Sequence, residues 1–147
     1  MVTVRKAEKS DRDDYLKMRK LLWPECSTDR HEHEIDLILS SSGVVLLAEL
    51  SQSGVVGFAE VSIRKDHVEG TTKSPVPYLE GWYVYPKHQG MGIGKALINA
   101  AEDFAIKMGF NELASDTDLT NATAIAIHKR IGFTEVGRTV HFVKRIR

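Results

Sequence analysis

Three glycines at alternate positions separate an apolar segment with strand character from a long segment with helical periodicity. The loop runs Gln89-Gly90-Met91-Gly92-Ile93-Gly94, and Lys95 follows it directly. Backbone N–H groups at a helix N-terminus attract anions, and glycines let the backbone come close and adopt positive φ. Residues 89–95, called the glycine loop below, therefore predict a strand-loop-helix unit that binds a phosphate-like group.

Spaced glycines alone leave other interpretations open. A dinucleotide-binding fingerprint opens an early βαβ unit, whereas four predicted strands precede this loop. A Walker-type loop ends in Gly-Lys-Ser or Gly-Lys-Thr, and this chain has Gly94-Lys95-Ala96 instead. A turn that merely joins a strand to a helix also has this spacing. Other motifs have to decide among these interpretations.

Periodicity along the rest of the chain predicts alternating strands and helices. Strands are expected at residues 2–8, 44–50, 55–64, 78–85 and 112–116, with one or two closing strands at 136–145. Helices are expected from Ser10 to Pro24, from Thr28 or Asp29 to Gly43, from Ile93 to Gly109 and from Asn121 to Gly132. We therefore expect an α/β (α+β) fold with a mixed, mostly antiparallel sheet of six to seven strands, flanked by four helices.

Length and composition predict one domain that spans residues 1–147. Twenty Lys plus Arg balance twenty Asp plus Glu, so the basic excess typical of nucleic-acid binding is missing. No apolar run approaches the roughly 20 residues that span a bilayer, and the polar start predicts no signal peptide. A single cysteine, Cys26, fits a reducing compartment. We expect a cytoplasmic protein that binds neither nucleic acid nor membranes.

Two acidic residues are candidates for chemistry. Glu80 lies in mid-strand beside aromatic residues, and Asp116 ends the next predicted strand. Carboxylates at neighbouring strand ends can bind an ammonium group and, directly or through water, remove one of its protons. The plain alternatives are a strand glutamate that faces solvent and an aspartate that caps a turn.

The sequence His31-Glu32-His33-Glu34 contains residue types that bind metals. Residues two apart diverge on a helix, however, and do not converge on one ion. We therefore expect a solvated helix face there and no metal site.

With the glycine loop placed between a strand and a helix, the chain resembles the GNAT superfamily of N-acetyltransferases. The family loop pattern Gln/Arg-x-x-Gly-x-Gly/Ala is matched by Gln89, Gly92 and Gly94. A second family segment, Asn-x-x-Ala with a later aromatic position and Gly-Phe, is matched by Asn121, Ala124, His128 and Gly132-Phe133. The resemblance covers essentially the whole chain.

This resemblance implies that acetyl-coenzyme A (acetyl-CoA) is the cosubstrate and that its pyrophosphate lies on the glycine loop. The expected coenzyme-binding residues are Tyr83, Val84, Gln89, Gly90, Met91, Gly92, Ile93, Gly94, Lys95, Asn121 and His128. A backbone N–H near Val84 would donate to the thioester oxygen as it gathers charge. Direct acetyl transfer to an amine is expected, because Cys26 has no histidine that its sequence position would pair with it.

A narrower resemblance is to the aminoglycoside 6′-N-acetyltransferases. It rests on Leu22-Trp23, Val68-Glu69-Gly70-Thr71, Ser74-Pro75-Val76, Leu79-Glu80-Gly81, Tyr83-Val84 and Ala114-Ser115-Asp116. It implies that Glu80 and Asp116 are the catalytic acids and hold a polycationic sugar. Trp23 and His67 complete the expected substrate-binding set. His67 and His128 stand where the families often have tyrosine.

The expected function is thus acetyl transfer to the 6′-amine of an aminoglycoside, which would confer antibiotic resistance. Other acceptors remain as alternatives: a protein N-terminus, a polyamine or a small metabolite. A non-catalytic module that binds acetyl-CoA is a further alternative. We also expect a homodimer that pairs through strands such as Thr139 to Lys144, since apolar residues alternate there and an open edge strand invites pairing.

Overall fold

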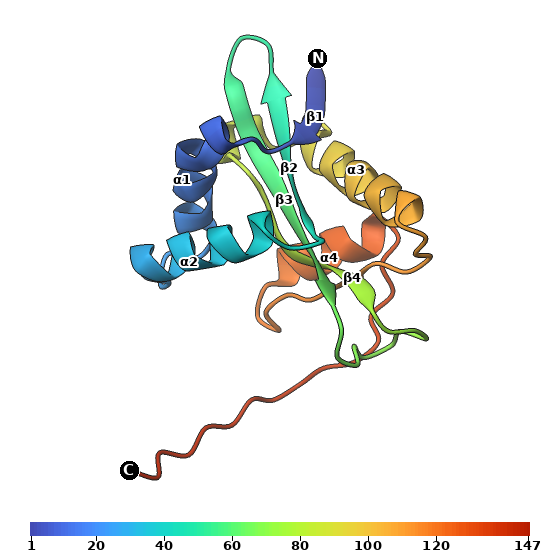
Figure 1. The fold of residues 1–147 in the computed structure, drawn as a ribbon. Helices are drawn as coiled ribbons and strands as arrows, with labels where there is room; N and C mark the ends of the chain where they lie inside the picture. Colours follow the sequence, from blue (N-terminus) through green and yellow to red (C-terminus); the bar gives the residue numbers. More distant parts are fainter.

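The computed structural model describes residues 1–147, and strands and helices alternate along it (Figure 1). The strands are β1 (Val2–Lys6), β2 (Val44–Leu50), β3 (Gly54–Arg64), β4 (Val76–Val84) and β5 (Ala114–Ser115). The helices are α1 (Arg12–Leu22), α2 (Thr28–Leu39), α3 (Ile93–Lys107) and α4 (Ala122–Arg130). Short 3₁₀ turns at Lys9–Asp11 and Pro86–His88 precede α1 and the glycine loop.

The sheet has the order β1-β2-β3-β4-β5, with three antiparallel pairs and a parallel β4–β5 pair. The α/β class, the mixed sheet and the four helices agree with the prediction. The number of strands does not: the sheet has five strands, because residues 136–145 form none. No backbone hydrogen bond ties the chain after Phe133 to the rest of the fold.

The C-terminal segment, residues 134–147, leaves the body of the molecule (Figure 1). Val136 still touches the connection between β3 and β4, residues 65–75, which is called the long loop below: a Cβ placed on Gly70 would come within 2.6 Å of Val136. Beyond that point the segment is exposed, including Val140 at 73% and Phe142 at 89%. The alternating pattern that predicted closing strands is real, but this chain provides no strand for it to pair with.

Helices cover both faces of the sheet. α3 packs on the face formed by side chains such as Val56, Ala59, Leu79 and Val84. α1 and α2 cover the opposite face, where Tyr15, Met18 and Ile35 contact Leu47 and Phe58. Figure 1 shows α1 and α2 on one side of the strands and α3 on the other. None of the helices is long and apolar enough to cross a membrane.

β4 contains a bulge that decides where its side chains point. Glu60 of β3 is opposite Gly81, and the next residue, Val61, is opposite Leu79, so Glu80 has no partner in the ladder. Such an extra residue interrupts the alternation of side chains between the two faces. Leu79 and Trp82 accordingly both pack toward α3, although they are three positions apart, while Tyr83 packs on the α1–α2 face.

Candidate active site

The glycine loop has the backbone geometry of an anion site. Gly90 and Gly92 have φ of +81° and +79°, and a Cβ on either would meet open space. Their requirement for glycine is therefore conformational, since other residues rarely adopt this region. Gln89 fixes the loop to β4, because its Nε2 donates to the carbonyl oxygen of Val84 at 3.1 Å.

The amides of this loop are free. α3 begins at Ile93, and its first bond into the loop runs from Ala96 N–H to the carbonyl of Gly92. The N–H groups from Gly90 to Lys95 donate to no backbone carbonyl. Unpaired N–H groups at the start of a fifteen-residue helix combine with the helix dipole to favour a bound phosphate.

The sheet opens beside this loop. β4 and β5 pair only at Tyr78–Ala114 and Leu79–Ser115. From Glu80 to Val84 the edge of β4 therefore has no strand beside it. Trp82 borders the opening and donates from Nε1 to the carbonyl of Gly94 at 3.1 Å, which ties β4 to the first turn of α3.

His128 lies on the other side of this opening, with its ring edge-on to Trp82 at a centroid distance of 5.7 Å. Its Nδ1 is 2.7 Å from the carbonyl oxygen of Ala124, and its Nε2 is 2.9 Å from Ser115 Oγ. A carbonyl only accepts, so Nδ1 carries the proton in the neutral ring and Nε2 accepts from the serine hydroxyl. His128 is thus held from both nitrogens, and the group closest to its Nε2 is Ser115.

Glu80 lies at the bulge and is not a freely solvated carboxylate. Its Oε1 accepts from Arg64 Nη2 at 2.7 Å, and its Oε2 accepts from Arg64 Nε at 2.8 Å and from Ser62 Oγ at 2.5 Å. About a quarter of the side chain, 25%, remains exposed. This is a bidentate ion pair of the kind that arginine forms with carboxylates.

Asp116 is joined to the same group of side chains through Tyr78. The Tyr78 hydroxyl donates to Asp116 Oδ2, and the guanidinium carbon of Arg64 lies 3.4 Å from the centre of the Tyr78 ring. Burial, followed by the hydrogen bond to Asp116, raises the pKa of Tyr78 above its usual range. Glu80 and Asp116 therefore belong to one cluster, with Arg64 and Tyr78 between them.

Trp23 follows α1 and packs against β4 next to Glu80. A Cβ on Gly81 would come within 2.5 Å of the Trp23 ring, so only glycine leaves room for the indole. Arg19 lies behind the indole, with its guanidinium carbon 4.7 Å from the ring centre. Trp23 thus borders the acid cluster from the α1–α2 side.

A buried polar network supports Trp23 and corrects one expectation. His31 is fully buried rather than solvated; its Nδ1 accepts from Arg19 Nε at 3.1 Å, and its Nε2 donates to the Trp23 carbonyl at 3.2 Å. Arg19 also pairs with Glu34 and with the buried Glu60. Burial raises the pKa of Glu60, and the charge of Arg19 opposes that rise. His31 and Glu34 thus belong to this network, whereas Glu32 and His33 remain exposed on α2.

Comparison with known proteins decides the family. Residues 11–133 match the Acetyltransferase (GNAT) family. The chain is 41% identical over 140 residues to an aminoglycoside N(6′)-acetyltransferase type 1 of Stenotrophomonas maltophilia. This alignment covers 95% of this chain and 91% of that protein. It is also 41% identical over 145 residues to an aminoglycoside N(6′)-acetyltransferase type 1 of Klebsiella aerogenes, covering 96% of this chain and 95% of that one. The chain belongs to the GNAT acetyltransferase family.

Solved structures agree with this assignment. AAC(6′)-Iy in complex with the bisubstrate analogue CoA-S-monomethyl-acetylneamine superimposes with a TM-score of 0.91 at 33% identity, covering 99% of both chains. The 6′-N-acetyltransferase AAC(6′)-Ih of Acinetobacter baumannii gives a TM-score of 0.90 at 34% identity and covers all of both chains. The GNAT architecture of this chain is thus shared along its whole length with enzymes solved as aminoglycoside acetyltransferases.

Three of the predicted site residues lie outside the cluster formed by Glu80, Asp116, Arg64 and Tyr78. His67 is exposed in the long loop, and its nearest charged partner is Glu69 at 3.9 Å. Asn121 caps α4, since its Oδ1 accepts from Ala124 N–H at 3.0 Å. Lys95 is exposed on the first turn of α3. The Lys95 side chain and the amide nitrogen of Asn121 have no hydrogen-bond partner within the chain, so both are free to contact a ligand.

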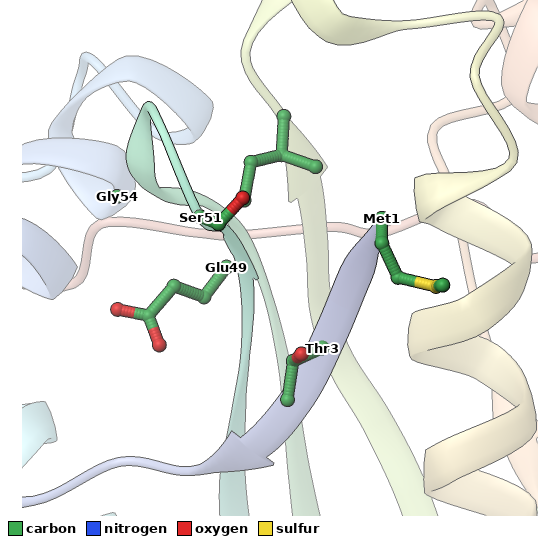
Figure 2. A pocket seen from close by; sticks show the side chains of 6 residues that line it. Met1, Thr3, Glu49, Ser51 and Gly54 are labelled. Carbon is green, nitrogen blue, oxygen red and sulfur yellow. The ribbon is translucent and has the colours of Figure 1, made fainter.

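A separate hollow of about 380 Å³ lies at the other edge of the sheet, between β1 and the β2–β3 turn (Figure 2). Its one charged lining residue, Glu49, already accepts from Arg5 Nε at 3.1 Å. None of the predicted site residues lines it. The predicted site residues lie instead around the opening beside β4 and the cluster of Glu80 and Asp116.

Proposed function

We propose that this GNAT chain transfers the acetyl group of acetyl-CoA to the 6′-amino group of an aminoglycoside, and thereby confers resistance to such antibiotics. The observation that carries the proposal is full-length similarity to aminoglycoside 6′-N-acetyltransferases at up to 41% identity. The acid cluster supports it, because a polycationic acceptor needs carboxylates and a sensor that only binds acetyl-CoA does not. In this proposal residues 1–147 form one catalytic domain.

The residues divide the work between two sides of β4. The glycine-loop amides hold the pyrophosphate, and the unpaired edge of β4 and the His128 side chain border the extended arm that follows it. When bound, acetyl-CoA supplies the activated acetyl group. No step in this proposal calls for a metal ion, because backbone amides and the dipole of α3 supply the positive potential that the phosphates need.

On the acceptor side, Glu80 and Asp116 attract the ammonium form of the amine, and Trp23 borders the sugar. One carboxylate, directly or through water, then takes a proton from the ammonium and frees the nitrogen lone pair. The nitrogen adds to the thioester carbonyl, and the C–S bond then breaks. The second proton of the nitrogen passes to the departing thiolate, and the carboxylate releases the first proton to solvent, so the products are the amide and free coenzyme A. A thiolate is a tolerable leaving group near neutral pH because thiol pKa values are about 8.5.

The test is an assay of free coenzyme A with a panel of acceptors. Kanamycin-type aminoglycosides, an aminoglycoside with a hydroxyl in place of the 6′-amine, a linear polyamine and an N-terminal peptide are compared under one set of conditions. We expect turnover only where the 6′-amine is present. Preference for the peptide or the polyamine would replace the aminoglycoside with another acceptor, and release with no acceptor would point to a coenzyme-binding module.

We further propose that the protein is a homodimer. In this dimer, residues 134–147 of each copy form a strand that pairs with the β5 edge of the other copy. The free edge of β5 adjoins a groove of about 420 Å³ whose apolar lining comes from Ala105, Ile106, Phe110, Leu113, Ile131 and Phe133. The segment from Thr139 to Lys144 carries exposed Val140, Phe142 and Val143, which have no apolar neighbours of their own chain to cover them. An added strand would satisfy the β5 edge and cover these side chains together.

Light scattering on the purified protein tests the dimer. We expect the wild type to have twice the mass of one chain at micromolar concentration. The double variant Val140→Asp, Phe142→Asp is expected to have the mass of one chain, because charges would enter the apolar groove. Leu37→Asp, an exposed apolar position on α2, is the matched control and should leave the mass unchanged. A wild-type mass of one chain would refute the dimer.

The proposal also places the enzyme in the cytoplasm. Cys26 is free, and an unpaired thiol is typical of a reducing compartment.

A further inference from the structure

A cation of the protein itself already occupies the acid cluster. Arg64 is the last residue of β3, and its guanidinium donates to both carboxylate oxygens of Glu80, at 2.7 and 2.8 Å. Its guanidinium carbon lies 3.4 Å from the centre of the Tyr78 ring, and the Tyr78 hydroxyl donates to Asp116. The guanidinium therefore lies between the two carboxylates that are proposed to attract the amine of the acceptor.

This pair leaves Glu80 little capacity for another cation. A carboxylate has two oxygens, and here Arg64 engages both while Ser62 adds a third donor. An incoming ammonium group would need the same oxygens, and two positive charges at one carboxylate repel each other. An acceptor ammonium group at Glu80 would therefore compete with Arg64 for the same oxygens.

Arg64 is placed so that it can leave. Its side chain is 42% exposed and reaches Glu80 from the solvent side, whereas the side chain of Arg19 is 1% exposed and lies between Glu34 and Glu60. Exposed ion pairs contribute little net stability, because solvent screens them and competes for both partners. The buried pair is a fixed part of the fold, and the exposed pair can exchange its cation.

We propose that Arg64 is a resident counter-ion of the acceptor site, which the ammonium group of the acceptor displaces from Glu80. This inference rests on the proposed aminoglycoside acetyltransferase function and adds a residue that sets acceptor specificity. Displacement favours polycations, whose other amines remain near Asp116 while one competes for Glu80. A simple monoamine lacks that second contact and competes poorly with Arg64.

Steady-state kinetics of Arg64→Gln test the displacement. We expect the acceptor KM to fall by about threefold to tenfold, in keeping with the modest strength of an exposed pair. The KM for acetyl-CoA should stay constant, and aminoglycosides with few amino groups besides the 6′-amine should gain more than those with many. Lys65→Gln removes the same charge one residue further along, where the side chain is exposed and makes no ion pair, and should change the acceptor KM less than Arg64→Gln does.

An unchanged or raised acceptor KM in Arg64→Gln, with wild-type turnover of aminoglycosides intact, would overturn the inference and show that Arg64 only orients Glu80. A wild type that fails to acetylate any aminoglycoside would instead refute the proposed function. The two failures are therefore distinguishable. Arg64→Lys keeps the charge but loses the two-pronged contact, so it should fall between the wild type and Arg64→Gln.

A spectroscopic readout observes the displacement without turnover. The Nε–H resonance of Arg64 is identified in a ¹H–¹⁵N spectrum by its absence from Arg64→Lys. Since Nε donates to Glu80 in the free protein, we expect this resonance to shift when an aminoglycoside is titrated in without acetyl-CoA. A resonance that stays in place at saturating aminoglycoside would show that the pair persists in the complex and would refute displacement.

Discussion

Glu80 combines two properties that sequence position alone would not suggest. It is the residue without a partner in the β3–β4 ladder, and it carries a bidentate contact to Arg64. The bulge directs its carboxylate to the same side of β4 as Gly81 and Trp23. Its function as a candidate acid thus depends on one extra residue in a strand.

Replacing the acids should affect the acceptor and spare the coenzyme. Glu80→Gln and Asp116→Asn are each expected to lower kcat/KM for the acceptor by at least about tenfold, or about 1.4 kcal/mol. The reason is that each removes a charge that attracts the ammonium group. Acetyl-CoA affinity, measured by calorimetry, should stay nearly constant, and exposed Glu32→Gln on α2 serves as the control. Equal losses for both substrates would indicate a folding defect and contradict the assignment.

His128 is expected to support the reaction without being its acid. Its Nδ1 is engaged by Ala124 and its Nε2 by Ser115, so the neutral ring has no free N–H to offer. We expect His128→Ala to lower kcat by less than about tenfold, below the 10²–10⁴ of a general acid. Single-turnover kinetics with bound acetyl-CoA check this. A loss of a hundredfold or more with normal coenzyme binding would make the imidazole the proton donor.

Several residues of the site could not be found from the sequence. Arg64 and Ser62 contact Glu80 across the β3–β4 pair. The register of this pair could not be predicted, because a long loop joins the two strands and the sequence does not show where each strand begins and ends. Ser115 meets His128 only because α4 returns over β5. His31 looked like part of a polar helix face, whereas its partner Arg19 lies on another helix. Such contacts between separate elements leave no local pattern.

At the scale of elements, the sequence pattern predicted a strand or helix correctly where that element also packs or pairs with a neighbour in the fold. β2 has the predicted bounds of 44–50, and α3 begins at the predicted Ile93. Asn121 caps α4 as expected. The segment at 136–145 has equally good strand periodicity but forms no strand, because a strand needs a neighbour and this one has none within the chain. The bulge escaped prediction because one unpaired residue does not alter the composition of a strand.

The glycine loop offers a prediction at this scale. Gly92→Asp should weaken acetyl-CoA binding at least about tenfold, because its carboxylate would oppose the pyrophosphate. Gly54→Asp is the matched control: Gly54 has φ of +74° and open space around its Cβ position, much as Gly92 has at +79°, but is the first residue of β3, far from the glycine loop in the chain. Calorimetry should show normal affinity for Gly54→Asp. Equal affinity for both folded variants would remove the loop from the binding site.

For the whole molecule, we expect the four tyrosines to make the free energy of unfolding fall as the pH rises in the alkaline range. Burial is the first cause that raises the pKa of each of the four tyrosines, Tyr15, Tyr78, Tyr83 and Tyr85, above the ordinary value of 10.0. Below about pH 9 these residues are protonated in both states, so the free energy of unfolding does not depend on their titration. As the pH rises above that value, the unfolded chain loses these protons first, so the free energy of unfolding falls.

A spectrophotometric titration checks this. Phenolate absorbance in the native protein should lag behind that of the urea-unfolded chain, and the urea midpoint should fall between about pH 9 and about pH 11. Tyr78→Phe should lessen the decline, because it removes one of the shifted groups. Superimposable titration curves for the folded and unfolded chains would contradict the buried hydroxyls.

The bulge at Glu80 also bears on how such an enzyme can change over generations. Because one unpaired residue interrupts the alternation of side chains along β4, the side chains proposed to face the acceptor and those packed under α3 come from different positions of one strand. Substitutions on the α1–α2 face of β4 can reshape the acceptor side while Trp82 and Val84 keep their packing under α3, except at Gly81, where any side chain would meet the Trp23 ring. A lineage under pressure from new drugs can therefore vary one half of its site with little penalty to the other.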